Sequence, residues 1–362
     1  MGRAFSRFET EDCAALVEAR FEAIERIARL ANEHQCDAVL VAGDVFDAQI
    51  VADRTIRRAF NAIKEFAGPW VMLPGNHDAA LAESVWTRAK RLGAVPENVH
   101  LALEPGIIHL EPQGLAILCA PLTQRNTYSD LTEIFNTWET PERLIRVGLA
   151  HGSVQGVLPD DIDSANPILP NRAEAARLDY LALGDWHGTK QIDERTWYSG
   201  TPEPERFRNN GAGYALIVDV PGPGELPKVT PVETARYQWH QWRETLTVES
   251  DLDQMLERLQ ALPESSVVDL RLEGAVTLAG EEKLIDELSV AEARFRSIQC
   301  DRSRLQLEPT DEDIAALKAD GYVGEVIEHL RNPQKVDDAE AARDALAILA
   351  GLLKDRKREA GE

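Results

Sequence analysis

Two neighbouring stretches decide the fold of this chain, AVLVAGDVFD at residues 38–47 and WVMLPGNHD at residues 70–78. Each starts as an apolar run and ends in a glycine followed by polar side chains. Such a run predicts a strand buried on both faces of a sheet. Residues 53–66 between them carry apolar side chains at helical spacing, and Asp53 is expected to cap that helix. Strand, helix and strand in this order predict a parallel crossover unit and therefore an α/β fold.

Two later stretches repeat the pattern, VGLAH at residues 147–151 and YLALGDWH at residues 180–187. In an extended chain Asp185 and His187 point to the same side. Open α/β sheets bind ligands beyond the carboxyl ends of their strands, so the polar residues after the four strands are expected to meet. Oxygen and imidazole donors in one crevice suit a divalent metal such as manganese or zinc. The candidate donors are Asp44, Asn76, His77, His151, Asp185 and His187.

Any one of these signals has a simpler explanation. A strand that ends in Gly-Asp also occurs in nucleotide-binding and phosphotransfer folds, and a single buried histidine such as His151 is usually part of a core. A nucleotide-binding site would require a glycine-rich phosphate loop, and the sequence contains neither GxxxxGK[ST] nor GxGxxG after a predicted strand. The four signals in this order favour the metal site.

Taken together, GDxxD, GNHD, a strand-end histidine and a final x-x-H pair resemble the calcineurin-like metallophosphoesterase superfamily. Within it, the chain is most similar to the SbcD-type DNA repair nucleases, because YSGTP at residues 198–202 is followed by a hairpin and a small α/β module. The resemblance implies a metallophosphoesterase β-sandwich flanked by helices over residues 1–236. It also implies a small α/β capping domain over 237–305 and a C-terminal helical tail over 306–362.

The resemblance also implies the metal ligands. Asp44 would bridge two ions, His187 would bind the first, and Asn76, His151 and Asp185 would bind the second. The family usually has histidine where this chain has Asp185, and a carboxylate there shifts the preference toward harder ions. We therefore expect two manganese ions, with magnesium as the alternative.

Three further residues receive roles from the same resemblance. His77 would assist the leaving group or stabilise the transition state, and Asp78 would orient His77. Asp47 would support the metal ligands from outside. The family also has a D-x-H motif at the start of its first strand, whereas this sequence begins Met1-Gly2-Arg3. The expectation is that upstream codons encode an apolar strand ending in that motif.

Composition limits the class of protein and its location. The formal net charge of −23 argues against unaided binding to nucleic acid, although bound metal ions or a partner subunit would add positive charge. The four cysteines form no CxxC motif, which is typical of reduced cytosolic thiols. No apolar run approaches the ~18 residues of a membrane span, and residues 1–5 lack the apolar core of a signal peptide. The expected location is the cytoplasm.

Two other segments bear on function. Residues 154–171 are rich in Pro, Asp and Asn and predict a long loop, which could form a lid or a substrate edge. Residues 311–330 and 337–357 predict two helices, which either dock onto the chain's own core or bind a partner. The resulting hypothesis is a metal-dependent DNA phosphodiesterase, an exo- or endonuclease in DNA repair, that forms a homodimer and works with an SMC-like coiled-coil ATPase. The alternatives are a phosphodiesterase for small nucleotides or other phosphoesters, and a non-catalytic scaffold.

Overall fold

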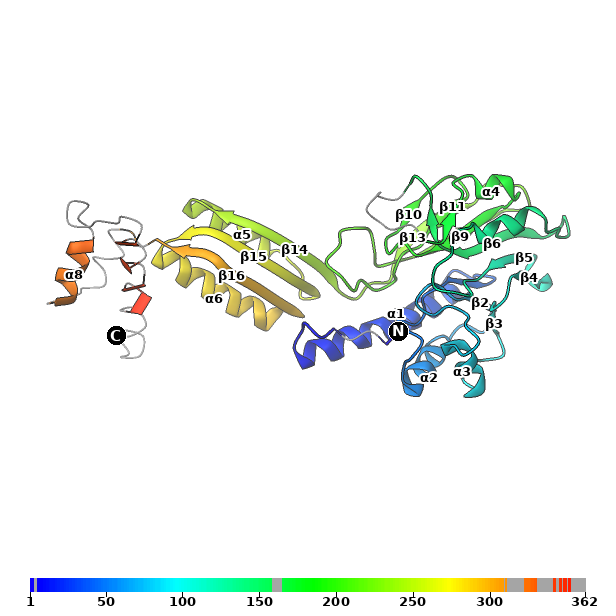
Figure 1. Ribbon diagram of the computed structural model, residues 1–362, viewed down its shortest axis with the longest axis horizontal. Helices are drawn as coiled ribbons and strands as arrows, with labels where there is room; N and C mark the ends of the chain where they lie inside the picture. Colours follow the sequence, from blue (N-terminus) through cyan, green and yellow to red (C-terminus); the bar gives the residue numbers. More distant parts are fainter. Residues whose placement is uncertain are drawn as a thin grey trace. The chain divides into compact units, whose positions relative to one another are not determined.

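The computed structural model describes residues 1–2, 5–157, 165–308, 310, 322–330, 341–342, 345–346, 348–349 and 351–352. The chain separates into two compact units, Met1–Tyr237 and Gln238–Glu362. The predicted α/β fold class is confirmed, since both units combine helices with largely parallel sheets (Figure 1). None of the described helices has the length and apolar character that crossing a bilayer requires.

The first sheet of the Met1–Tyr237 unit has three parallel strands, β1 (Val39–Ala42), β2 (Trp70–Leu73) and β3 (Val99–Leu101), in that order. Helices α1 (Thr10–Glu33), α2 (Asp53–Ala62) and α3 (Val85–Arg91) accompany it. The predicted crossover from β1 through α2 to β2 is confirmed. Asp53 does not cap α2, because the helix begins one residue earlier than the cap prediction requires and Ala52 occupies the N-cap position.

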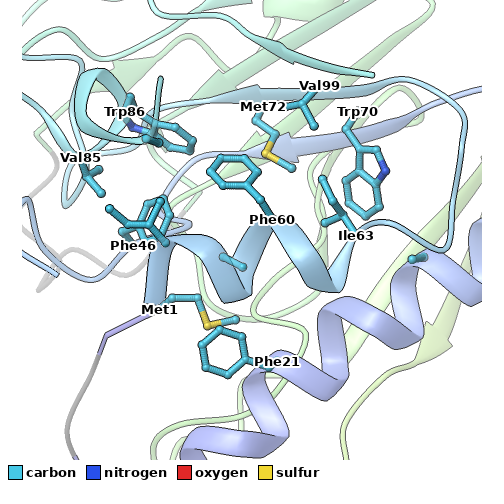
Figure 2. Close-up of a cluster of buried hydrophobic side chains, with 14 of the residues drawn as sticks. Met1, Phe21, Phe46, Phe60, Ile63, Trp70, Met72, Val85, Trp86 and Val99 are labelled. Atoms are coloured by element: carbon cyan, nitrogen blue, oxygen red, sulfur yellow. The ribbon is translucent and has the colours of Figure 1, made fainter. Parts of the chain in front are cut away.

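Aromatic side chains fill the space between this sheet and its helices. Phe60 of α2 and Ile63, the residue directly after this helix, point toward Met72 and Trp70 of β2 (Figure 2). Phe46, in the loop after β1, packs edge-to-face on Trp86 of α3 with ring centroids 5.5 Å apart. Such a pair contributes about 0.5–1.5 kcal/mol beyond its buried area. The loop that carries Asp44 and Asp47 is therefore anchored in a packed core.

The second sheet has six strands in the order β10-β11-β9-β6-β5-β4. Its central strands β5, β6, β9 and β11 are parallel, and β4 and β10 pair antiparallel at the two edges. Their bounds are β4 (Gly106–Leu110), β5 (Leu115–Ala120), β6 (Ile145–His151), β9 (Tyr180–Gly184), β10 (Lys190–Gln191) and β11 (Thr196–Tyr198). Strand β1 of the first sheet packs against β6 and β9 of the second.

Short elements complete this unit. They are η1 (Glu111–Gln113), η2 (Leu131–Asn136), β7 (Ser153–Val154), β8 (Pro167–Ile168), α4 (Arg172–Ala175) and the hairpin β12 (Tyr214–Asp219) with β13 (Lys228–Glu233). In the predicted loop at residues 154–171, the described ends form part of β7 and β8, which pair with each other. Residues 158–164 lie outside the described residues.

One prediction about β1 was wrong. The strand was expected to be buried on both faces, but all four of its residues are only half-buried, whereas all four of β2 are buried. The reason is a cavity of about 920 Å³, lined in part by Val41 of β1, Val147 of β6 and Ile217 of β12. Among the described strands, β1 pairs only with β2 and β12 only with β13.

The unit that starts at Gln238 has a parallel sheet in the order β14-β15-β16. It alternates β14 (Gln238–Leu246), α5 (Glu249–Gln260), β15 (Ser266–Val276), α6 (Leu278–Arg294) and β16 (Ser297–Leu307). Leucines of α5 and α6 share one core with the sheet. Beyond it, α8 (Tyr322–Leu330) is the described part of the first predicted tail helix, and most of the second lies outside the described residues.

Candidate metal centre

Parallel pairing brings the polar strand ends together. Asp44 follows β1, Asn76 follows β2, His151 ends β6 and Asp185 follows β9. Asp44 and Asp185 have positive φ angles, +54° and +104°. Non-glycine residues rarely adopt such angles, which cost about 1–3 kcal/mol each and concentrate at functional sites. The strained backbone turns both carboxylates toward His151.

Three of the predicted ligands lie close together. The Nε2 atom of His151 is 3.5 Å from Asp44 Oδ2 and 3.6 Å from Asp185 Oδ1. The other Asp44 oxygen, Oδ1, accepts a hydrogen bond of 2.9 Å from the backbone N–H of His77. The structure thus places two carboxylates around one imidazole nitrogen.

Two buried atoms at this point have no hydrogen-bond partner. They are Asn76 Oδ1 and His151 Nε2, and both belong to predicted metal ligands. A buried polar atom without a partner costs about 1–3 kcal/mol. A carbonyl oxygen and an imidazole nitrogen without partners are donor types that a divalent metal accepts, so the donors present fit such a metal. As they stand, the described residues contain no group of three or more His, Cys, Asp or Glu side chains arranged to hold a metal ion.

The electrostatics of His151 indicate an anionic pocket. Burial alone would lower the pKa of His151, but the negative charges of the nearby Asp185 and Asp44 carboxylates outweigh burial and raise the pKa to about 9. The carboxylates therefore favour a positive charge at a position with almost no exposure to solvent. A proton on His151 or a metal cation would meet that preference.

Glycines allow the close approach of the strand-end loops. A Cβ atom on Gly43 would lie 2.3 Å from His151 Nδ1, and one on Gly75 would lie 2.2 Å from Asp44 Oδ1. Both distances are far below van der Waals contact. The GD and GN pairs in the sequence therefore reflect a steric requirement of the site.

His77 is exposed, and its Nδ1 atom lies 3.2 Å from the backbone oxygen of Asp47. Since a carbonyl oxygen only accepts, Nδ1 is the donor in this contact. The carboxylate of Asp78 instead accepts hydrogen bonds of 2.7 Å from Gly75 N–H and 3.0 Å from Phe46 N–H. It therefore joins the loop after β1 to the loop after β2. Burial and the nearby charge of Asp44 raise the pKa of Asp78 to about 6, against the effect of these two hydrogen bonds.

The carboxylate of Asp47 does not point into the metal pocket. Arg20 of α1 donates two hydrogen bonds to it, of 2.8 and 3.1 Å, and the Met1 amino group lies 3.0 Å away. Burial on its own would raise the pKa of Asp47, but Arg20 above all, with a smaller contribution from the amino group, holds that pKa well below its usual range. Asp47 is thus ionised and fixed, and it presents its backbone oxygen to His77.

His187 lies at the edge of the site beside a residue that the sequence reasoning missed. Its Nδ1 atom is 3.7 Å from Glu205 Oε1, and the Glu205 side chain is only 6% exposed. Arg20 also contacts Glu205, at 3.6 Å. The only signal for Glu205 in the sequence was that residues 202–206 follow directly after the last strand-end motif. That signal applies equally to Glu203. The structure brings Asp44, His151 and Asp185 together, and these three line one cavity with His77 and His187. Asn76 follows Gly75, whose backbone packs against Asp44, but Asn76 itself is not among the residues that line that cavity.

Comparison with known proteins gives distant relatives. The chain is 26% identical over 219 residues to the DNA double-strand break repair protein Mre11 of Methanosarcina acetivorans, which covers 56% of this chain and 33% of that protein. It is 22% identical over 215 residues to the uncharacterized metallophosphoesterase YhaO of Bacillus subtilis, which covers 56% of this chain and 50% of that protein. The chain thus spans half or less of the length of these relatives.

A solved structure and a family model complete the comparison. The crystal structure of TT1561 of Thermus thermophilus is similar with a TM-score of 0.42 and 13% identity, over 60% of this chain and 94% of that one. Residues 17–218, more than half of the chain, match the model for calcineurin-like phosphoesterases, and this range contains every strand-end residue described above. The chain therefore belongs to the calcineurin-like phosphoesterase family.

Proposed function

We propose that this chain is a metal-dependent phosphodiesterase that cleaves DNA. The observation that carries the proposal is the partnerless buried donor His151 Nε2 between the carboxylates of Asp44 and Asp185, supported by a second partnerless donor, Asn76 Oδ1. Asp44, Asn76, His151, Asp185 and His187 would hold two divalent ions, with manganese proposed and magnesium as the alternative. When bound, such ions supply Lewis-acid stabilisation of the charge that develops on the phosphoryl oxygens.

The chain's own residues would position the loops around the metal site and protonate the leaving group. Asp44 holds the backbone of His77 through Oδ1, so the GNHD loop stays at a fixed distance from the metal pocket. With Nδ1–H held by the Asp47 carbonyl, the protonated ring of the exposed His77 would donate its Nε2 proton to the leaving-group oxygen and become the neutral Nδ1–H tautomer. Asp78 fixes both loops by its two backbone hydrogen bonds. Its role is thus to hold the loop that carries His77.

DNA is proposed as the substrate on the likeness to Mre11, which is named as a DNA double-strand break repair protein. A net charge of −23 disfavours phosphate binding by this chain alone, so a partner would supply basic surface. We infer an SMC-like coiled-coil ATPase as that partner and a homodimer as the active form. The β14–β16 unit would act as a capping domain and the residues after it as the partner-binding tail. The described cysteines are free, in keeping with a reducing cytoplasmic location.

The test combines two substrates with one site variant. The full chain is incubated with Mn²⁺ and either end-labelled duplex DNA or bis-p-nitrophenyl phosphate, beside His151→Ala. Cleavage of DNA that is lost in His151→Ala is the expected result. Cleavage of the small ester without DNA cleavage, even with the ATPase present, would favour the small-phosphoester alternative. Absence of both activities together with unchanged Mn²⁺ binding in His151→Ala would favour the scaffold.

A further inference from the structure

The structure assigns Glu205 as the positioning residue of His187, held in place by Arg20 of α1. This inference rests on the proposed metal site. A series of side-chain contacts runs from Asp47 through Arg20 and Glu205 to His187, and its two middle members, Arg20 and Glu205, belong to no motif.

Arg20 contacts two carboxylates at once, those of Asp47 and Glu205. It donates hydrogen bonds of 2.8 and 3.1 Å to Asp47 and lies 3.6 Å from Glu205 Oε2. The Arg20 side chain is 11% exposed, so these contacts are largely shielded from water. The rigid guanidinium fixes the direction of the Asp47 carboxylate by its two hydrogen bonds and keeps the Glu205 carboxylate close by an ion-pair contact. Helix α1 is thereby tied to both sides of the site.

Glu205 faces the Nδ1 side of the His187 ring. Oε1 of Glu205 is 3.7 Å from Nδ1 of His187, slightly beyond hydrogen-bond length. Hydrogen bonds at catalytic sites are often long before the ligand binds and shorten afterwards. A carboxylate at Nδ1 keeps the proton on that nitrogen and leaves Nε2 with its lone pair free for a metal. Arg206, 3.4 Å from the same Oε1, limits how far Glu205 can turn away.

Glu203, two residues before Glu205, has a different structural role. Its oxygens accept hydrogen bonds from the backbone N–H groups of Arg236, at 2.6 Å, and Tyr237, at 3.1 Å. It thus anchors the chain at the end of the Met1–Tyr237 unit. Glu203 and Glu205 are both buried and only two residues apart. Glu203→Gln is therefore a matched control for changes at Glu205.

The experiment measures Mn²⁺ binding to the full chain by isothermal titration calorimetry. The variants are Glu205→Ala, Glu205→Gln, Glu203→Gln, His187→Ala and the double variant His187→Ala/Glu205→Ala. Loss of an outer carboxylate that orients a metal-binding histidine typically costs about 10–100-fold in metal affinity. We expect that loss in Glu205→Ala, a smaller one in Glu205→Gln because the amide oxygen still accepts from Nδ1–H, and none in Glu203→Gln.

The double variant separates positioning from a general structural role. If Glu205 acts through His187, removing it should change nothing further once His187 is alanine, so the two effects are not additive. Thermal unfolding of every variant checks the fold. Additive effects, or wild-type Mn²⁺ affinity in Glu205→Ala, would overturn the inference. If His187→Ala itself binds Mn²⁺ like the wild type, the assignment of His187 in the proposed metal site fails instead.

Discussion

The Nδ1 atom of His151 lies 2.8 Å from the carbonyl oxygen of Ala42, so the last residue of β6 is hydrogen-bonded to the last residue of β1. A carbonyl oxygen only accepts, so Nδ1 is the donor and the neutral ring keeps its lone pair on Nε2. That lone pair points between Asp44 and Asp185. One hydrogen bond between the two sheets thus fixes both the direction and the tautomer of a proposed metal ligand.

His77→Asn should remove most of the turnover and leave the metal content unchanged. His77 makes its only described side-chain contact with the Asp47 carbonyl, away from the proposed ligands, and general acids contribute about 10²–10⁴-fold to rate. The measurement is phosphodiester cleavage together with manganese content by elemental analysis. His109→Asn, at an exposed histidine on β4, is the control. Full activity in His77→Asn would remove this residue from the mechanism.

Asp185→Ala should weaken Mn²⁺ binding, and Asp185→His should largely restore it. All three side chains place a Cβ atom at the positive φ angle of residue 185, which Asp and His adopt more readily than Ala, so thermal unfolding of each variant separates backbone strain from metal binding. Asp and His differ from Ala in offering a donor atom toward His151. Calorimetric titration of the three proteins decides, and equal affinities would show that Asp185 is no ligand.

Gly43→Ala should be far more damaging than Gly224→Ala. The two glycines have φ angles of +93° and +86°, so alanine meets similar backbone strain at both. Only at Gly43 would the new methyl group collide with His151 and Gly75, whereas Gly224 has open space. We expect a loss of about 1–3 kcal/mol in unfolding free energy at Gly224 and a larger loss at Gly43, with Mn²⁺ binding impaired only there. Denaturant titration and calorimetry measure the two effects, and equal losses would contradict the steric account.

Glu203 should make the unfolding free energy depend on pH. Burial raises the pKa of Glu203 to about 7 against the hydrogen bonds from Arg236 and Tyr237, with smaller effects from Arg26 and Glu22 of α1. The folded protein then holds a proton that the unfolded chain loses at a lower pH, near the ordinary value for glutamate. Stability should therefore fall as the pH rises from about 4.5 to about 7, by on the order of 3 kcal/mol.

Glu203→Gln tests this expectation, because an amide does not titrate. Urea unfolding of the variant and the wild type at several pH values between 4 and 8 gives the comparison. The wild type should lose stability across the range and the variant should lose less. Parallel pH profiles would show that Glu203 is not responsible.

Much of the site was predictable because it depends on local pattern. The apolar runs that end in Gly-Asp, Gly-Asn or histidine are parallel strands in the structure. The polar residues after such strands lie at the same edge of a sheet, beyond the carboxyl ends of the strands. Arg20 and Glu205 were not predictable, because they come from a helix and a loop about 185 residues apart and only the packing of α1 joins them. The role of Asp78 was also hidden, since a sequence does not show whether a carboxylate faces a ring or two backbone N–H groups.

The Met1–Tyr237 unit contains a cavity of about 920 Å³ beside β1, and this cavity affects how the unit responds to hydrostatic pressure. Pressure favours states in which internal voids are filled with water, and the volume lost on unfolding grows with the void, usually about 20–100 mL/mol. Because the exposed His77 lines the same cavity, water can enter it from that side, and only its dry part beside the half-buried β1 adds to this volume. As pressure rises, the strand-end residues that line the cavity should lose their alignment before the sheets themselves unfold.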